Sequence, residues 1–251
     1  MNFKTKSILV LATALVGTAA MAQTAPAAPE STLSFNIGAV SDYRFRSVSQ
    51  TSFKPALQGG VDFAHASGAY IGAWASNVSW IKDYVGATDG TTEVDVYLGY
   101  KGAITSDLAF DIGVITYQYP GNTADKVLVN ANTTEVYGAL TYGIATVKYS
   151  QSTGNFIANP NSSGSAYLEL AATFDLGGGF SLTPHVGRQT IPNNSTGDYT
   201  DFSLALGKDF GGGLTGALTA YSTDAKDSFY KVGTFDNLGK SGLAVGVKYS
   251  F

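Results

Sequence analysis

Apolar and polar residues alternate along most of the chain after residue 31. In the last eleven residues, for example, apolar side chains occupy every second position, at Leu243, Val245, Val247, Tyr249 and Phe251. A period of two predicts β-strands with one apolar face. Twelve segments show this pattern, namely residues 32–46, 55–65, 69–76, 92–100, 108–117, 134–142, 145–150, 166–174, 181–189, 198–210, 214–221 and 241–251.

The segments between these predicted strands alternate in length. Those after the odd-numbered strands are long or polar, namely residues 47–54, 77–91, 118–133, 151–165, 190–197 and 222–240. Those after the even-numbered strands are short and mostly contain glycine, namely residues 66–68, 101–107, 143–144, 175–180 and 211–213. Long loops at one end and short turns at the other are typical of outer-membrane β-barrels, whose tilted strands cross the bilayer with about 9 to 11 residues.

These patterns predict an all-β fold: a closed antiparallel transmembrane β-barrel of 12 strands, formed by residues 32–251. The last strand is expected to pair with the first, because closure removes both exposed edges of the sheet. Val247, Tyr249 and Phe251 at its end are the expected assembly signal, read by the outer-membrane assembly machinery. With the short turns on the periplasmic side, both termini are expected in the periplasm.

The first 22 residues have the pattern of a secretory signal peptide. Lys4 and Lys6 precede an apolar stretch over residues 8–16, and Ala20-Met21-Ala22 follows as an A-x-A cleavage pattern. The apolar stretch is shorter than the roughly 20 residues that a transmembrane helix needs. We therefore expect an exported protein with a short periplasmic segment at residues 23–31 and an outer-membrane barrel after it.

The predicted outward face carries aromatic residues where the strands reach the short turns. An interfacial girdle of this kind is typical of membrane barrels. Its predicted members are Phe63, Tyr100, Tyr142, Phe174, Phe210 and Tyr249.

The predicted inward face is small or polar, which favours a water-containing lumen over a packed core. If the alternation of the first segment continues through Phe45, then Arg44 and Arg46 face inward, opposite several acids. Charges on opposing walls would form a constriction that orients small polar solutes. Alternatively, these groups only satisfy one another inside the barrel. The predicted pore-lining residues are Arg44, Arg46, Asp62, Glu93, Asp95, Asp111, Glu135, Lys148, Glu169, His185 and Asp201.

Composition excludes several other classes of function. The full chain has 15 Lys and Arg against 19 Asp and Glu, and removal of Lys4 and Lys6 leaves 13 basic residues. An acidic chain is not expected to bind nucleic acid. Cysteine is absent, which excludes disulfides and thiolate metal sites.

Catalytic and metal-binding patterns are weak. The two histidines, His65 and His185, stand in no recognisable catalytic spacing, so we predict neither an enzyme nor a cofactor. Carboxylates in the long loops offer oxygen ligands for divalent cations shared with lipopolysaccharide, although solvated loop charge is the favoured explanation. These carboxylates are Asp83, Asp89, Asp125, Asp224, Asp227 and Asp236.

The first strands also resemble a known family. The segments 41–51 (SDYRFRSVSQT), 55–62 (PALQGGVD) and 68–78 (GAYIGAWASNV) are similar to the opening of the TorF family of porin-like proteins, and 93–100 (EVDVYLGY) resembles its fourth strand. Ser47 stands where relatives are expected to have glycine. The resemblance implies an exported outer-membrane barrel and no particular substrate.

The leading functional hypothesis is a porin-like channel for passive diffusion of small hydrophilic solutes. Because 12 strands lie between filled 8-stranded barrels and wide 16-stranded porins, the pore is expected to be narrow. Two alternatives stay open: a plugged structural or adhesive barrel, and a secreted soluble β-sandwich that binds a ligand. The expected partners are outer-membrane lipid, including lipopolysaccharide, the assembly machinery and the solutes.

Overall fold

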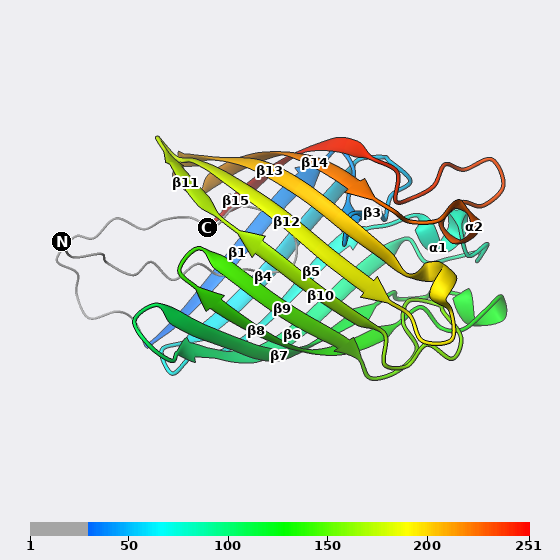
Figure 1. The fold of residues 1–251 in the computed structure, drawn as a ribbon, viewed down its shortest axis with the longest axis horizontal. Helices are drawn as coiled ribbons and strands as arrows, with labels where there is room; N and C mark the ends of the chain where they lie inside the picture. The colour runs from blue at the N-terminus through cyan, green and yellow to red at the C-terminus, as the bar shows by residue number, and fades with distance from the viewer. Residues whose placement is uncertain (1–29) are drawn as a thin grey trace.

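A computed structural model describes residues 30–251 (Figure 1). Each strand of the barrel wall pairs with the next one along the chain, and the last strand pairs with the first. The predicted signal peptide lies outside these described residues, as does almost all of the predicted segment 23–31. The wall strands are β1 (Ser31–Val40), β4 (Ala56–His65), β5 (Ala69–Asn77), β6 (Thr92–Ala103), β7 (Leu108–Gln118), β8 (Thr133–Tyr142), β9 (Ala145–Ser152), β10 (Ala166–Ala172), β11 (Phe174–Gly177), β12 (Phe180–Thr190), β13 (Tyr199–Gly211), β14 (Leu214–Thr223) and β15 (Gly242–Ser250).

The prediction of a closed 12-stranded antiparallel barrel is confirmed. β10 and β11 both pair with β12 and form one wall strand that is interrupted at Thr173. The barrel closes between β1 and β15, in the register Asn36↔Ser250 to Val40↔Gly246. Phe35 and Phe251 extend this seam with two backbone hydrogen bonds of 2.8 and 3.0 Å, and their rings stack at 5.8 Å. The terminal aromatic residue is thus part of the closed sheet.

The outer wall is apolar and the inner wall is not. Leu33, Leu57 and Leu243 are 60%, 64% and 69% exposed, whereas the inward Asp201 and Glu135 are fully buried. A soluble protein would cover such a continuous apolar surface, but a bilayer solvates it. The closed barrel with its apolar side outward therefore rules out the soluble β-sandwich alternative, whose apolar faces would pack against each other.

The two ends of the barrel differ as the segment lengths predict (Figure 1). The marked C-terminus lies at the end with the short turns, which we call the turn end. Glycines with positive φ form two of these turns, Gly177–Gly179 and Gly211–Gly213, a backbone conformation that side chains disfavour. The opposite loop end carries α1 (Trp80–Asp83), α2 (Asp227–Tyr230), η1 (Ala124–Lys126) and η2 (Ser195–Gly197).

All six predicted girdle aromatics lie on the outer wall near the turn end, and each is at least 41% exposed. Their role at a membrane interface stays a prediction. Within residues 30–251, no helix has the length and apolar composition that a membrane span requires.

The first predicted strand is wrong in its second half. β1 ends at Val40, which pairs with Ala56 on one side and Gly246 on the other, and the chain then leaves the wall. A small hairpin of β2 (Arg44–Phe45) and β3 (Val48–Ser49) follows. Its two turn residues, Arg46 and Ser47, have φ of 49° and 66°. Left-handed backbone at both central positions makes a two-residue hairpin turn and cannot continue an extended strand. Arg44 and Arg46 therefore do not lie on the barrel wall.

Candidate functional site: the barrel lumen

Residues 41–55, which we call the inserted segment, fold into the lumen and reach its far wall. Arg46 donates to Glu135 Oε2 on β8 at 2.7 Å and to Gln189 Oε1 on β12 at 2.8 Å. Ser47 Oγ donates to Asp201 Oδ1 on β13 at 2.7 Å. Since the segment leaves the wall between β1 and β4, these bonds tie it across the barrel.

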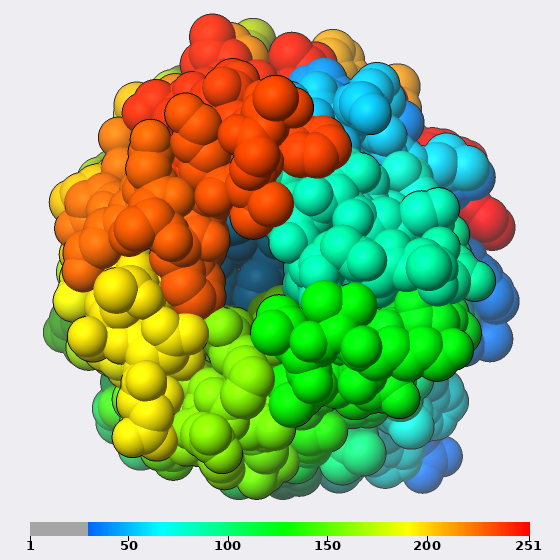
Figure 2. All heavy atoms as spheres, turned by 90° about the vertical axis from the view of Figure 1, so that its right-hand side faces the viewer, coloured from blue at the N-terminus to red at the C-terminus, as the bar shows by residue number. Residues whose placement is uncertain are grey.

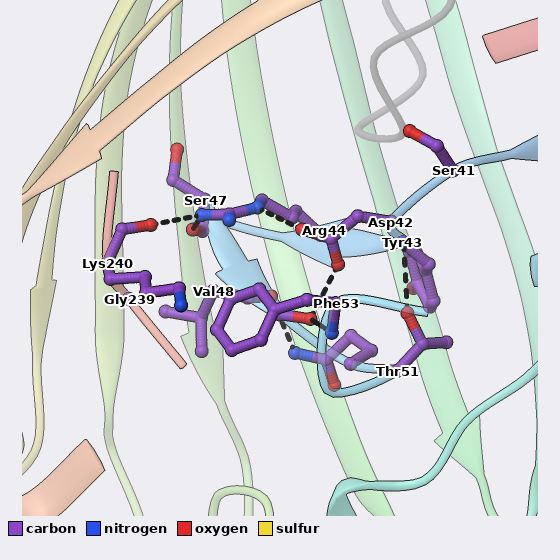
Figure 3. Close-up of polar contacts among 12 residues, drawn as sticks. Ser41, Asp42, Tyr43, Arg44, Ser47, Val48, Thr51, Phe53, Gly239 and Lys240 are labelled. Carbon is purple, nitrogen blue, oxygen red and sulfur yellow. Dashed lines mark hydrogen bonds and ion pairs between the residues drawn. The ribbon is translucent and has the colours of Figure 1, made fainter. Parts of the chain in front are cut away.

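Arg44 fixes the near side of the inserted segment (Figure 3). Its Nε donates to Asp42 Oδ2 at 2.7 Å, and its Nη1 donates to the carbonyl oxygens of Ser47 at 3.1 Å and Lys240 at 2.8 Å. The guanidinium also lies 5.1 Å from the ring centre of Tyr221. Arg44 thus joins the inserted segment to the loop that precedes β15.

Arg46 is equally committed to protein partners. Besides its pairs with Glu135 and Gln189, its guanidinium lies 4.7 and 4.3 Å from the ring centres of Phe45 and Tyr167. Its side chain is only 7% exposed. The structure therefore places both predicted arginines inside the barrel, one of them against a predicted carboxylate, but with their guanidinium groups bound to protein instead of open to a solute.

The loop-side half of the lumen, where these contacts lie, is closely packed. The predicted acids Glu93, Asp95, Glu135 and Asp201 are at most 4% exposed. Tyrosine hydroxyls donate to three of them: Tyr43 to Glu93 at 2.9 Å, Tyr117 to Glu135 at 3.2 Å and Tyr167 to Asp201 at 2.8 Å. One oxygen each of Glu93, Asp95 and Glu135 is buried without a hydrogen-bond partner. An isolated buried charge is costly, so this layer depends on Arg46.

His185 and Glu169 lie at the boundary of this buried layer. His185 Nε2 is 3.2 Å from Glu169 Oε2, and its Nδ1 is 3.6 Å from Asp201 Oδ1. Both side chains are partly exposed, at 16% and 17%.

The turn-side half of the lumen is open by comparison. The predicted Asp62, Asp111 and Lys148 are half-buried there, together with Lys101 and Lys248. Tyr97 donates to Asp62 and Tyr70 donates to Asp111, each at 2.5 Å. The predicted site omits Lys101 because the fourth strand is predicted to end at residue 100, three residues before β6 ends at Ala103. The same alternation that turns Glu93 and Asp95 inward also turns Lys101 inward once β6 runs to Ala103.

Glycines allow the tyrosines of this half to lie flat against the wall. Tyr70 pairs directly with Gly99, and Tyr137 pairs directly with Gly113. A Cβ on either glycine would come closer than 3.0 Å to the paired tyrosine. Such pairs cover the backbone with aromatic rings and keep the rings away from the barrel axis.

Small residues leave a gap beside the inserted segment. Thr219 and Ala217 on β14 and Ala244 and Gly246 on β15 face Arg44 across a cavity of about 40 Å³. A cavity of this volume holds on the order of three water molecules. From the loop end, the loops surround a central hollow in which blue atoms of the first part of the described chain are visible (Figure 2).

The outer loops contact one another above this hollow. The Tyr84 hydroxyl donates to the carbonyl oxygen of Asp236, and the rings of Tyr84 and Phe235 lie 5.5 Å apart. Burial, with the nearby carboxylates of Asp236 and Asp83, raises the pKa of Tyr84 to about 12. The Tyr230 hydroxyl donates to the carbonyl oxygen of Gly197 at 2.6 Å.

The six loop carboxylates named above do not converge. Asp83 accepts a hydrogen bond from Ser52 at 2.6 Å, Asp224 accepts one from the Thr200 amide at 2.6 Å, and Asp236 pairs with Lys240. Across residues 30–251, the side chains of His, Asp and Glu form no group of three that could hold a metal ion.

Comparison with known proteins agrees with the fold. No curated protein matches the sequence. Among solved structures, a KdgM porin is similar with a TM-score of 0.56 at 9% identity, over 87% of this chain and 99% of that porin. A NanC porin is similar with a TM-score of 0.52 at 12% identity, over 88% of this chain and 99% of that porin. At these identities the likeness shows a porin fold alone.

The TorF resemblance stays a prediction, because the family model that matches has a different description. That model covers residues 23–251 and describes bacterial proteins of unknown function. The chain belongs to this family, Gcw_chp.

Proposed function

We propose that the protein is an outer-membrane channel through which small hydrophilic solutes diffuse passively, and that the inserted segment limits its conductance. The observation that carries this proposal is the inserted segment itself, which crosses the lumen of a barrel whose turn-side half is polar and half-exposed. Lys101, Lys148 and Lys248 point into the turn-side half. An unpaired ammonium group is costly to bury, so three of them on the inner wall favour a lumen that contains water over one that is filled only for stability.

The proposed path runs beside the inserted segment, along β14 and β15. Inward residues there are small, such as Ala217, Ala244 and Gly246, whereas the facing wall carries tyrosines and charged groups. The similar NanC and KdgM structures are porins, and one of the matching structures is described as a KdgM porin in complex with disordered oligogalacturonate. Passage of small polar solutes fits this fold and this lumen.

A plugged barrel is the second candidate, and a specific observation favours it. The guanidinium groups of Arg44 and Arg46 donate hydrogen bonds to protein partners on opposite sides of the lumen. These bonds hold the inserted segment firmly in place. In that case the outer loops, which contact one another through Tyr84 and Asp236, would form the functional surface.

Liposome swelling with sugars of increasing size separates the two candidates. For a narrow channel, we expect swelling with the smallest polyols and a steep decline towards disaccharides. A variant in which Asn-Gly replaces residues 44–49 should admit larger sugars. The Gln50 amide already donates to the Tyr43 carbonyl at 2.7 Å, so a two-residue turn can join these positions. Swelling by this variant with none by the wild type would identify a plug.

The outer-membrane location, the lipopolysaccharide contact and the assembly role of Val247, Tyr249 and Phe251 belong to this proposal. They are supported by the apolar outer wall and by the position of Phe251 in the seam. We propose a structural role for His185, which bridges Glu169 and Asp201, and no catalytic role.

A further inference from the structure

Two lysines in the turn-side half stand opposite carboxylates without pairing with them. Lys101 is directly across from Asp111 in the β6–β7 register, and Lys148 is directly across from Glu169 in the β9–β10 register. All four residues point inward. Within residues 30–251, neither ammonium group forms an ion pair with a carboxylate.

The carboxylates have other partners. Asp111 accepts the Tyr70 hydroxyl at 2.5 Å, and Glu169 lies 3.2 Å from His185 Nε2. The lysines instead cover aromatic faces: Lys101 Nζ lies 5.4 Å from the ring centre of Tyr70, and Lys148 Nζ lies 4.3 Å from that of Tyr137. A cation over an aromatic face is held less strongly than in an ion pair with good geometry. Neither ammonium group is therefore committed to a carboxylate within the described residues.

The two tyrosines form one continuous surface, which we call the tyrosine floor. The hydroxyl groups of Tyr70 and Tyr137 are hydrogen-bonded to each other, and the Tyr70 hydroxyl also holds Asp111. Lys101 and Lys148 thus each lie over one ring of the tyrosine floor, with Asp111 bonded to Tyr70 and Glu169 across from Lys148. Gly99 and Gly113 let the rings lie flat on the wall, so their faces are turned towards the lumen.

We propose that the tyrosine floor binds small carboxylates that also carry a ring with an apolar face, such as sugar acids. The carboxylate would take the two lysines away from the ring faces, and the ring of the solute would stack on the uncovered tyrosines. Asp111 accepts the Tyr70 hydroxyl and Glu169 lies against His185, so each carboxylate opposite a lysine already has another partner. This inference rests on the proposed function, because it names the class of solute that a channel would favour.

Equilibrium binding tests this site without requiring conduction. Sodium D-glucuronate and D-glucose share a pyranose ring and differ by a carboxylate, and each can be titrated calorimetrically into the barrel refolded in detergent micelles. We expect glucuronate to bind at least about tenfold more tightly than glucose, and Lys101→Gln/Lys148→Gln to lose about tenfold in glucuronate affinity. Lys82→Gln/Lys126→Gln removes the same charge from exposed loop positions and should bind as the wild type does.

Equal binding of the two sugars overturns the proposal, as does undiminished glucuronate binding by the correctly folded lumen variant. Migration of unheated and heated samples in detergent gels shows that each variant has formed a barrel. Lys148→Arg, which keeps the charge, should retain most of the affinity. A barrel that binds glucuronate but passes no current would refute the channel and leave the site intact, whereas a conducting barrel with no preference for glucuronate would refute the site alone.

Discussion

The two halves of the lumen have the same alternating strands but opposite interiors. In the loop-side half, the side chains of Arg46, Glu135 and Asp201 are almost completely buried. The inserted segment binds both acids there, Glu135 through Arg46 and Asp201 through Ser47. In the turn-side half, Lys101 and Lys148 are half-buried and unpaired with carboxylates, and tyrosines lie flat on the wall. In the proposed channel, the buried layer would set the width of the passage and the open half would meet the solute.

The largest expected effect is the loss of the buried ion pair. Glu135→Ala leaves the Arg46 guanidinium buried without its carboxylate and should lower the free energy of unfolding by about 3–5 kcal/mol. Lys148→Ala in the open half should change it by less than about 1 kcal/mol, because no ion pair is broken. Urea titration in detergent micelles measures both values. Equal losses would show that the two halves are packed alike.

Filling a glycine under the tyrosine floor should have the next largest effect. In Gly99→Ala, the new Cβ would come closer than 3.0 Å to Tyr70 and to the Ile112 carbonyl oxygen, which should cost about 1–3 kcal/mol of stability and weaken glucuronate binding. Gly138→Ala is a matched control, because its Cβ would only make an ordinary contact of 3.9 Å with Ile112. The interpretation fails if both variants keep wild-type stability and binding.

A smaller effect is expected at Ser47, where two substitutions separate the cost of the strained backbone from that of the lost hydrogen bond. Its φ of 66° is unfavourable for a residue with a Cβ, and its Oγ donates to Asp201 at 2.7 Å. Ser47→Gly loses the hydrogen bond but relieves the backbone, whereas Ser47→Ala loses the bond and keeps the strain. We therefore expect Ser47→Ala to be less stable than Ser47→Gly by about 1 kcal/mol. Equal stabilities in urea titrations would show that the backbone is unstrained.

Most of the wall could be predicted from the sequence, because successive residues of a barrel strand point alternately outward and inward. Segments such as 92–100 and 214–221 match β6 and β14 to within a few residues, and the loop and turn lengths follow the predicted alternation. The apolar side chains of the wall, such as that of Leu98, point outward instead of into a hydrophobic core. The position of a residue in the alternation therefore predicts whether it is exposed.

The inserted segment could not be predicted in this way. Tyr43, Phe45 and Val48 look like the continuation of an apolar face, but they are apolar because they pack inside the barrel against residues such as Trp74 and Tyr117. The expected glycine at position 47 is the one local signal, since glycine favours the positive φ that Ser47 adopts. The alternation shows that the acids on the far wall point inward. It does not show that they bind Arg46 and Ser47, because these partners are far apart in the sequence and meet only when the barrel closes.

Single-channel current in planar bilayers tests the central claim most directly. The wild-type barrel is compared with the variant in which Asn-Gly replaces residues 44–49, in the same potassium chloride solution. We predict a small, steady conductance for the wild type and a severalfold larger conductance for the variant, because the inserted segment crosses the lumen. Equal conductances, or a wild-type barrel that passes no current, would contradict a channel whose width is set by this segment.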